Sequence, residues 1–253
     1  MNSAISAKGL GFSWPGKMPL FEDFNLEMGM GETWAILGSS GCGKTSLLML
    51  FAGLLSPGSG ELRVAGEALT RPRPRTGLIL QDYGLLPWAT VRENVGLGLR
   101  VRDFYGPDGV HAPREQPAGP GIDHWLERLS IADIAGMYPG EISGGQRQRT
   151  AVARSLALGP DLLLMDEPFS SVDELIREDL QRLTLALCRE GGLSLVLVTH
   201  SIEEAAKMAS KVLVLGTPPN RVARVIANDA FGDPSEPGLR EARGALRKAL
   251  ELP

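Results

Sequence analysis

The apolar positions of this chain follow three successive patterns. From residue 5 to residue 80 they form short runs broken by turn residues, which predicts strands, and "SPGSGELRVAGEAL" in this part is typical of a hairpin. From residue 85 to residue 158 they recur mainly at helical spacing. Continuous apolar runs of the buried-strand type return after that. The order predicts an α/β chain with a helical part inserted between strand-rich parts.

The later runs predict a βαβ unit. "DLLLMDEP" and "LSLVLVTH" are runs of the buried parallel-strand type, and "ELIREDLQRLTLALCREGG" between them is an amphipathic helix that ends at glycine. The last stretch, "EPGLREARGALRKALEL", predicts one terminal helix. Residues 103–121 interrupt the helical part, and because eight of these nineteen residues are Gly or Pro, we expect a mobile surface loop there.

The turn inside "WAILGSSGCGKTSLLMLFAGLL", residues 34–55, predicts a phosphate-binding loop. Gly38, Gly43, Lys44 and Thr45 fit G-x-x-x-x-G-K-[ST], in which glycines let the backbone N–H groups curl around an anion at a helix N-terminus. The lysine reaches the outer phosphates, and the hydroxyl after it ligates Mg²⁺. A glycine-rich turn with a chance lysine is the alternative, but strand, loop and helix occur in the order that the motif demands. The predicted contacts with ATP in this loop are Gly38, Ser39, Ser40, Gly41, Cys42, Gly43, Lys44, Thr45 and Ser46.

Composition agrees with an ATPase and excludes other classes. The chain has 253 residues, 43 % of them hydrophobic, and a formal charge of −4 with Lys and Arg scattered, which gives no support to nucleic-acid binding. We expect no transmembrane segment and no signal peptide, because no apolar run approaches the roughly 18 residues of a membrane span. His111 and His124 have no carboxylate or cysteine cluster beside them, so a metal site there is not favoured.

Two carboxylates end the run "LLLMDEP". A buried strand of this kind places Asp166 at the carboxyl edge of the sheet beside the phosphate loop, where it can hold Mg²⁺ through water. Glu167 then faces the γ-phosphate and can act as the general base for an attacking water. The alternative is an ordinary strand end followed by an acidic helix cap.

A second anion-binding helix start is predicted in "YPGEISGGQRQRTAVARSL". Ser143, Gly144, Gly145 and Gln146 precede a helix. One chain does not readily bring this start and the phosphate loop to the same γ-phosphate. We therefore expect a second copy to supply it, in a homodimer that forms only with ATP.

With these motifs the chain resembles the nucleotide-binding subunit of an ATP-binding cassette (ABC) transporter along nearly its whole length. "ISGGQRQR" resembles the family signature, with Ile142 where leucine is usual. The resemblance implies one ABC ATPase domain over residues 1–253, with a RecA-like P-loop NTPase core and an antiparallel β subdomain in residues 1–84 and 159–253. It implies an α-helical subdomain with the signature in residues 85–158.

The resemblance also assigns roles to single residues. Gln81 resembles the glutamine that joins the Mg²⁺ shell and senses the membrane partner, and His200 resembles the histidine that contacts the γ-phosphate. Trp14 stands where the family stacks an aromatic ring on adenine, although Phe12 is a second candidate. Three sets follow: catalytic Glu167, His200, Lys44 and Gln81; Mg²⁺ ligands Thr45, Gln81 and Asp166; and, from "SSVD", Ser171 and Asp173 for communication across the dimer.

"LLPWATVRENVGLGL", after Gln81, resembles the importers of nitrate, sulfonates, taurine and related solutes. Leu86, Pro87 and Trp88 fall where the family receives a short helix from the membrane permease, whereas the plain alternative is apolar core. An extracytoplasmic solute-binding protein and a place on the cytoplasmic face of the membrane are implied as well. An exporter, or a lipoprotein-release or cell-division ATPase, stays open as the alternative. Ser201 departs from the aspartate that is common after the histidine.

Overall fold

A six-stranded, mainly parallel sheet runs through the chain. The computed structural model describes residues 3–105, 120–170, 172–229, 231–232 and 236–251. The strand order is β11-β9-β3-β8-β7-β6, and only β11 is antiparallel to its neighbour. The strands are β3 (Thr33–Gly38), β6 (Thr76–Ile79), β7 (Leu162–Asp166), β8 (Ser194–Val198), β9 (Lys211–Leu215) and β11 (Arg224–Ala227). The predicted βαβ unit is confirmed, because β7 and β8 pair in parallel.

A second, five-stranded sheet lies beside the first one, with the order β10-β2-β1-β4-β5. Its strands pair antiparallel except for β10, which runs parallel to β2. They are β1 (Ser3–Phe12), β2 (Phe21–Gly29), β4 (Ser59–Val64), β5 (Glu67–Ala68) and β10 (Asn220–Val222). The β4–β5 pair is the hairpin that the sequence predicted.

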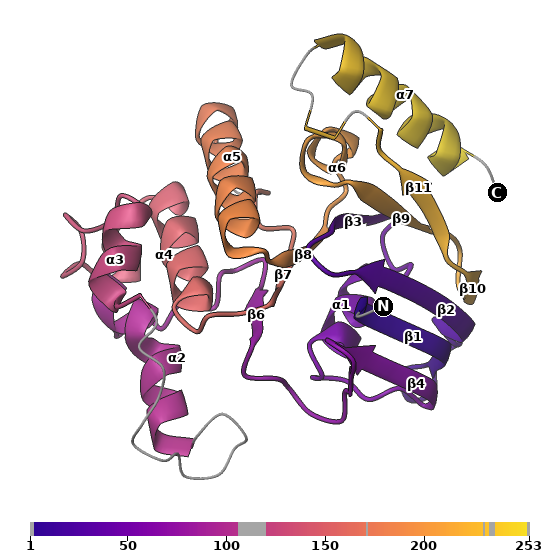
Figure 1. Ribbon diagram of the computed structural model, residues 1–253, viewed down its shortest axis with the longest axis horizontal. Helices are drawn as coiled ribbons and strands as arrows, with labels where there is room; N and C mark the ends of the chain where they lie inside the picture. The colour runs from indigo at the N-terminus through magenta and orange to yellow at the C-terminus, as the bar shows by residue number, and fades with distance from the viewer. Residues whose placement is uncertain (1–2, 106–119, 171, 230, 233–235, 252–253) are drawn as a thin grey trace.

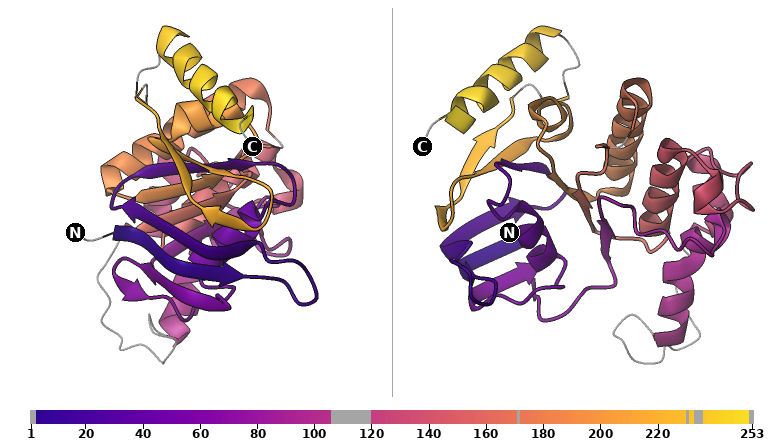
Figure 2. Two further views of the ribbon diagram at one scale, coloured as in Figure 1. Left: turned by 90° about the vertical axis from the view of Figure 1, so that its right-hand side faces the viewer. Right: turned by 180° about the vertical axis from the view of Figure 1, so that it is seen from behind.

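Three of the helices gather at one end of the molecule, apart from the antiparallel sheet (Figures 1 and 2). These are α2 (Val91–Tyr105), α3 (Ile122–Arg128) and α4 (Gly144–Leu156), preceded by the short 3-10 helix η1 (Pro139–Glu141). The predicted loop over residues 103–121 begins too early, because α2 continues through Tyr105; residues 106–119, with His111, lie outside the described residues. The remaining helices are α1 (Lys44–Phe51), α5 (Glu174–Gly191), α6 (Ile202–Met208) and α7 (Glu236–Glu251).

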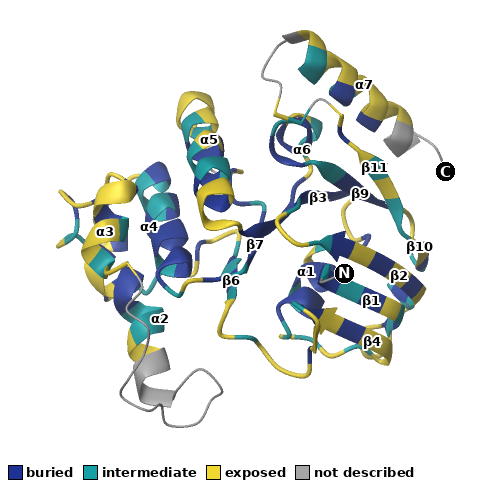
Figure 3. Cartoon of the chain, in the orientation of Figure 1, coloured by how far each residue is buried: buried dark blue, intermediate teal, exposed yellow. Residues whose placement is uncertain are grey.

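Helix α1 is buried between the two sheets, and this position fixes the loop before it (Figure 3). Leu47, Leu50 and Phe51 are at most 1 % exposed and pack in one cluster with side chains of both sheets. Five of its eight residues are buried, whereas Thr45 at its start is exposed. The turn between β3 and α1 therefore stands on a rigid base.

The strand order brings two chemically active ends together. Strand β8 lies between β3 and β7, so the carboxyl ends of β3 and β7, at Gly38 and Asp166, reach the same edge of the sheet. Ligands of open α/β sheets bind at this edge. The fold thus brings the predicted phosphate loop and Asp166 to the same edge of the sheet.

Candidate functional site

The predicted phosphate loop runs from the end of β3 to the start of α1 and depends on glycine at two positions. Gly43 has φ 108°, and a Cβ on it would lie 3.0 Å from the Phe21 ring. A Cβ on Gly38 would lie 2.6 Å from the Cys42 sulfur. No side chain caps α1 at Gly43, and the Leu47 amide bonds to the Gly43 carbonyl at 2.8 Å. The amides of the first three residues of α1, Lys44, Thr45 and Ser46, are thus available for an anion.

Two side chains hold this loop. The Lys44 ammonium donates to the carbonyls of Gly38 and Ser39, both at 2.9 Å, and so lies over the turn. From β10, the buried Asn220 amide donates to the Cys42 carbonyl at 3.1 Å, and its oxygen accepts from the Gly216 amide at 2.9 Å. Asn220 is not predictable from the sequence, since nothing near residue 220 signals a partner 178 positions away.

Asp166 lies beside Thr45, as a shared Mg²⁺ site requires. Burial raises the pKa of the Asp166 carboxyl, and a hydrogen bond with the Thr45 side chain opposes this rise. Gln81 and Asp166 line one pocket of about 650 Å³. A hydroxyl, a carboxylate and an amide oxygen are the hard donors that Mg²⁺ prefers, so these residues fit the ion. The three predicted ligands are therefore consistent with one site.

Glu167 and His200 lie close to each other at the end of β7 and after β8. The His200 Nδ1 atom is 3.3 Å from a Glu167 carboxylate oxygen. Glu167 has a left-handed backbone, φ 44°, which its amide supports by donating to the Val198 carbonyl at 2.9 Å. Left-handed non-glycine residues often occur at functional sites, where the surrounding structure holds the strain.

The segment around His200 is fixed by a buried network. The Thr199 hydroxyl donates to the Glu204 carboxylate at 2.6 Å and accepts from the Ser201 amide at 3.0 Å. Ser201, the departure from the family pattern, is the N-cap of α6 and accepts from the Glu204 amide at 3.2 Å. The network orients the backbone that carries His200.

Arg154 joins the segment after Gln81 to helix α4. Its guanidinium donates to the carbonyls of Tyr83 and Gly84, both at 2.6 Å. Both of these residues have positive φ, 65° and 55°. Burial lowers the pKa of Arg154, which nevertheless stays charged. This bridge was not predicted either, because its partners lie 70 and 71 positions before Arg154 in the sequence.

The signature residues begin α4. Ser143 and Gln146 form a capping box, with the Ser143 amide bonded to the Gln146 oxygen at 2.9 Å and the Gln146 amide to the Ser143 hydroxyl at 3.3 Å. Helix α4 lies among the clustered helices, apart from α1 (Figure 1). The chain by itself therefore does not bring Ser143 to its own phosphate loop. Asp173 is the exposed N-cap residue of α5, and Ser171 lies outside the described residues.

Trp14, rather than Phe12, offers an accessible ring. Phe12 is 9 % exposed and belongs to the core, whereas Trp14 is 39 % exposed. The two rings meet edge to face, 5.5 Å apart. Strand β1 ends at Phe12, and Trp14 follows it.

Trp88 is presented on a loop that Asn94 clamps. Trp88 is 74 % exposed, so the alternative that it is core is wrong for this residue. Asn94 is fully buried in α2; it accepts from the Leu86 amide at 2.8 Å and donates to the carbonyls of Leu86, Ala89 and Thr90 at 2.9 to 3.1 Å. In the same loop, Pro87 is exposed and Leu86 is half-buried. The role of Asn94 was not predicted from the sequence.

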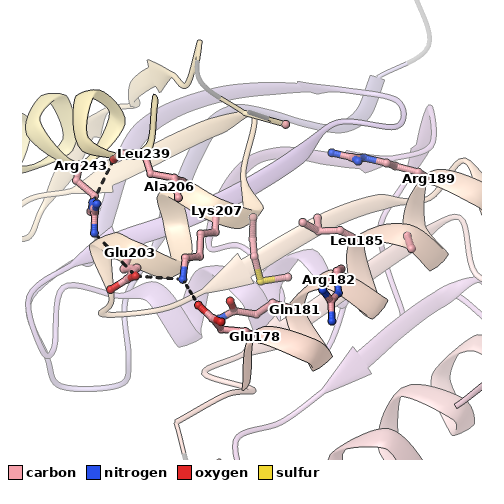
Figure 4. A pocket seen from close by; sticks show the side chains of 13 residues that line it. Glu178, Gln181, Arg182, Leu185, Arg189, Glu203, Ala206, Lys207, Leu239 and Arg243 are labelled. Atoms are coloured by element: carbon pink, nitrogen blue, oxygen red, sulfur yellow. Dashed lines mark hydrogen bonds and ion pairs between the residues drawn. The ribbon is translucent and has the colours of Figure 1, made fainter. Parts of the chain in front are cut away.

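A separate pocket of about 670 Å³ lies between α5, α6 and α7 (Figure 4). Lys207 crosses it, with its ammonium 2.8 Å from Glu178 and 3.1 Å from Glu203. None of the predicted site residues lines this pocket. Its ion pairs join α5 to α6, so we assign it a structural role.

Within the described ranges, no three His, Cys, Asp or Glu side chains form a group that could hold a metal ion. His124 is exposed and packs edge to face on Trp125, with ring centroids 5.0 Å apart. Among the helices described, none is both long and apolar enough to cross a membrane.

Comparison with known proteins defines the class. The sequence profile of ABC transporters matches residues 21–170. The chain belongs to the ABC transporter family, and it is an ATP-binding subunit whose ATP hydrolysis is coupled to transport.

Among curated relatives, the chain is 38 % identical over 226 residues to the "Taurine import ATP-binding protein TauB" of Chromobacterium violaceum, covering 88 % of this chain and 83 % of the relative. It is 34 % identical over 213 residues to the "Aliphatic sulfonates import ATP-binding protein SsuB" of Bacillus cereus, covering 84 % and 80 %.

The fold matches solved cassettes. The dimeric post-hydrolysis structure of the ATP-binding cassette MJ0796 bound to ADP and Pi matches with a TM-score of 0.72 at 25 % identity, over 88 % of this chain and 98 % of that one. The cbiO1 protein of Clostridium perfringens, part of the transporter complex cbiONQ, matches in fold with a TM-score of 0.75 at 22 % identity, over 100 % and 97 %. The predicted P-loop NTPase fold class is confirmed.

Proposed function

We propose that this chain energises the import of taurine or a closely related sulfonate through a membrane permease. The observation that carries the proposal is its likeness to taurine and aliphatic-sulfonate import subunits over more than four fifths of its length. The exporter and lipoprotein-release alternative is not favoured, because these relatives are import proteins. The solute-binding protein outside the membrane and the place of this chain on the cytoplasmic face follow from the same proposal.

Each half of the nucleotide site has a defined task. Lys44 and the amides at the start of α1 bind the phosphates, and Glu167 orients the attacking water and takes its proton, with His200 at 3.3 Å to hold the carboxylate and contact the γ-phosphate. Mg²⁺, held by Thr45, Asp166 and Gln81, would neutralise charge on the β- and γ-phosphates. Ser143 to Gln146 of a second copy complete the site.

Two copies thus close on two ATP molecules and reopen after hydrolysis. Trp88 and its neighbours pass this movement to the permease. The division into a core over residues 1–84 and 159–253 and a helical subdomain over residues 85–158 belongs to this proposal, since the subdomain would carry both Ser143 and the permease contact.

The test is Glu167→Gln, which keeps the shape of the side chain but removes its basicity. ATP should still bind, hydrolysis should fall by about 10² to 10⁴, and a closed dimer should accumulate with Mg·ATP but not with ADP, as measured by light scattering. Glu174→Gln, at an exposed glutamate seven residues further on, is the matched control and should hydrolyse ATP normally. Full-speed hydrolysis by Glu167→Gln would exclude the role of Glu167.

A second variant tests the shared site. Adding Ser143→Arg to Glu167→Gln should abolish the dimer, because the bulky cation at the start of α4 keeps the partner's γ-phosphate away. If the double variant still dimerises with ATP, the two copies do not meet through this helix start. For the solute, vesicles that hold this chain with its permease should take up taurine only when ATP is supplied on the side of this chain.

A further inference from the structure

Trp14 makes a contact that base stacking does not require. Its indole Nε1 donates a hydrogen bond to the Ser46 hydroxyl at 3.2 Å, across 32 positions of sequence. Ser46 is the third residue of α1 and is 9 % exposed. The ring is held in this orientation by its edge-to-face contact with Phe12. The aromatic ring and the phosphate loop are therefore joined by a hydrogen bond.

The chemistry of the two groups decides which of them donates in this hydrogen bond. An indole N–H can only donate, whereas a serine hydroxyl has one proton to donate and two lone pairs that accept. Because a Ser46 lone pair accepts from Trp14, the hydroxyl proton has to point away from the indole. Among the described residues the Ser46 hydroxyl donates to no protein acceptor. Its proton is thus left for a ligand at the start of α1.

We propose that Trp14 is a positioning residue for phosphate binding: its indole N–H orients the Ser46 hydroxyl so that the hydroxyl donates to a phosphate oxygen. The exposed face of the same ring remains available for adenine. The inference rests on the proposed nucleotide function and adds that the base and phosphate parts of the site are coupled through one side chain. The affinity for a phosphate ligand that has no base should therefore depend on the residue at position 14.

The experiment uses inorganic tripolyphosphate with Mg²⁺, which cannot stack on Trp14. In Trp14→Phe the ring that packs on Phe12 and could stack on adenine is kept, and only the N–H is lost. We expect tripolyphosphate to bind about two- to tenfold more weakly by isothermal titration calorimetry, the effect of one hydrogen bond. Ser46→Ala should weaken binding similarly, and adding Trp14→Phe to it should change nothing further.

The matched control is Trp125→Phe. The Trp125 indole N–H is buried without a hydrogen-bond partner in the described part of the chain, so its removal breaks no such bond. Binding of tripolyphosphate by this variant should equal that of the wild type. Steady-state kinetics give a second measure: Trp14→Phe should raise KM for ATP with kcat little changed, because the phosphate contact exists before and during the reaction.

Three results would overturn the inference. Trp14→Phe could bind tripolyphosphate like the wild type, which would leave Trp14 with stacking alone. Trp14→Phe could weaken binding equally with and without the Ser46 hydroxyl, which would mean that Trp14 does not act through Ser46. Trp125→Phe could weaken binding as much as Trp14→Phe does, which would mean that the loss is not specific to position 14. Failure of the proposed function looks different, because then Lys44→Ala would bind ATP and tripolyphosphate as well as the wild type does.

Discussion

The carboxylate that we assign to the water step, Glu167, lies on a strained backbone. A left-handed conformation costs a residue with a Cβ roughly 1–2 kcal/mol, and here it is held by the bond to Val198 and by the Ser170 hydroxyl, which donates to the Glu167 carbonyl at 2.9 Å. The turn aims the side chain into the site instead of continuing β7. Strain at this residue is therefore part of how the site is built.

A glycine variant measures this strain. Glu167→Gly removes both the base and the Cβ, so it should lose hydrolysis while its free energy of unfolding exceeds that of Glu167→Gln by about 1 kcal/mol. Urea denaturation of the two variants gives the difference. The control Glu174→Gly, in the first turn of α5, should be less stable than Glu174→Gln, since glycine weakens a helix. Equal stabilities of the two Glu167 variants would show that no strain is stored there.

Both cysteines should be unreactive in the folded protein. Cys42 and Cys188 are 1 % and 2 % exposed, and burial raises the pKa of both thiols, that of Cys188 to about 12. Iodoacetamide at pH 8 should therefore label them only after unfolding, as mass spectrometry would show.

The raised pKa of Cys188 also predicts how stability changes with pH. Above about pH 8.5 the unfolded thiol loses its proton while the folded thiol keeps it, so the folded state loses stability as the pH rises. The difference in unfolding free energy between wild type and Cys188→Ala should therefore shrink by about 1.4 kcal/mol per pH unit over that range. A constant difference from pH 8 to pH 10.5 would contradict the buried, protonated thiol.

At the scale of elements, two features of the loop between β6 and α2 can be tested separately: its exposed Trp88 and the hydrogen bonds that fix its conformation. Trp88→Ala should leave stability and basal ATP hydrolysis near wild type, because the side chain is 74 % exposed, but it should weaken co-purification with the permease. Val222→Ala, at a valine that is 79 % exposed on β10, is the control and should assemble normally. Unchanged co-purification of Trp88→Ala would mean that this ring only faces solvent.

The Asn94 clamp predicts a different outcome for the same loop. Asn94→Ala leaves the Leu86 amide and three carbonyls without their partner, which should lower the free energy of unfolding by about 1–3 kcal/mol and weaken permease assembly with Trp88 still present. Thermal unfolding and co-purification measure the two effects. A stable Asn94→Ala protein that assembles normally would show that the loop keeps its shape without the clamp.

The sequence could predict those structural features whose cause lies in neighbouring residues. The phosphate loop, the strand before Asp166 and the signature helix follow from short-range patterns, and the parallel sheet then brings the first two together. Arg154 and Asn220 were not predictable, because their backbone carbonyl partners are 70 or more positions away in the sequence. The partners of Asn94 are only four to eight positions away, but a buried asparagine looks like any surface asparagine in the sequence. The end of α2 at Tyr105 was missed because the predicted loop was begun at residue 103, although the first glycine of the Gly- and Pro-rich stretch is Gly106.

At the scale of the whole molecule, the proposed dimer implies that each site needs the phosphate loop of one copy and the α4 start of the other. Two inactive variants, Lys44→Ala and Ser143→Arg, should therefore restore part of the hydrolysis when mixed. In the mixed dimer the Ser143→Arg chain keeps an intact loop, and the Lys44→Ala chain supplies an intact α4 start, so one of the two sites is whole. Inactivity of the mixture, in the presence of the permease, would contradict the shared site.

The bridge from Arg154 to Tyr83 and Gly84 has a mechanical consequence. Ser143 stands at the first end of α4 and Arg154 near its last turn, so about 16 Å of helix at 1.5 Å per residue separates them. A helix of this length is a stiff rod. In the proposed dimer, a push from the partner's nucleotide on the Ser143 end of α4 would pass along the helix to Arg154, and through its bonds to Tyr83 and Gly84 to the loop that carries Trp88. Helix α4 would then act as a lever between the nucleotide of one copy and the proposed permease contact of the other.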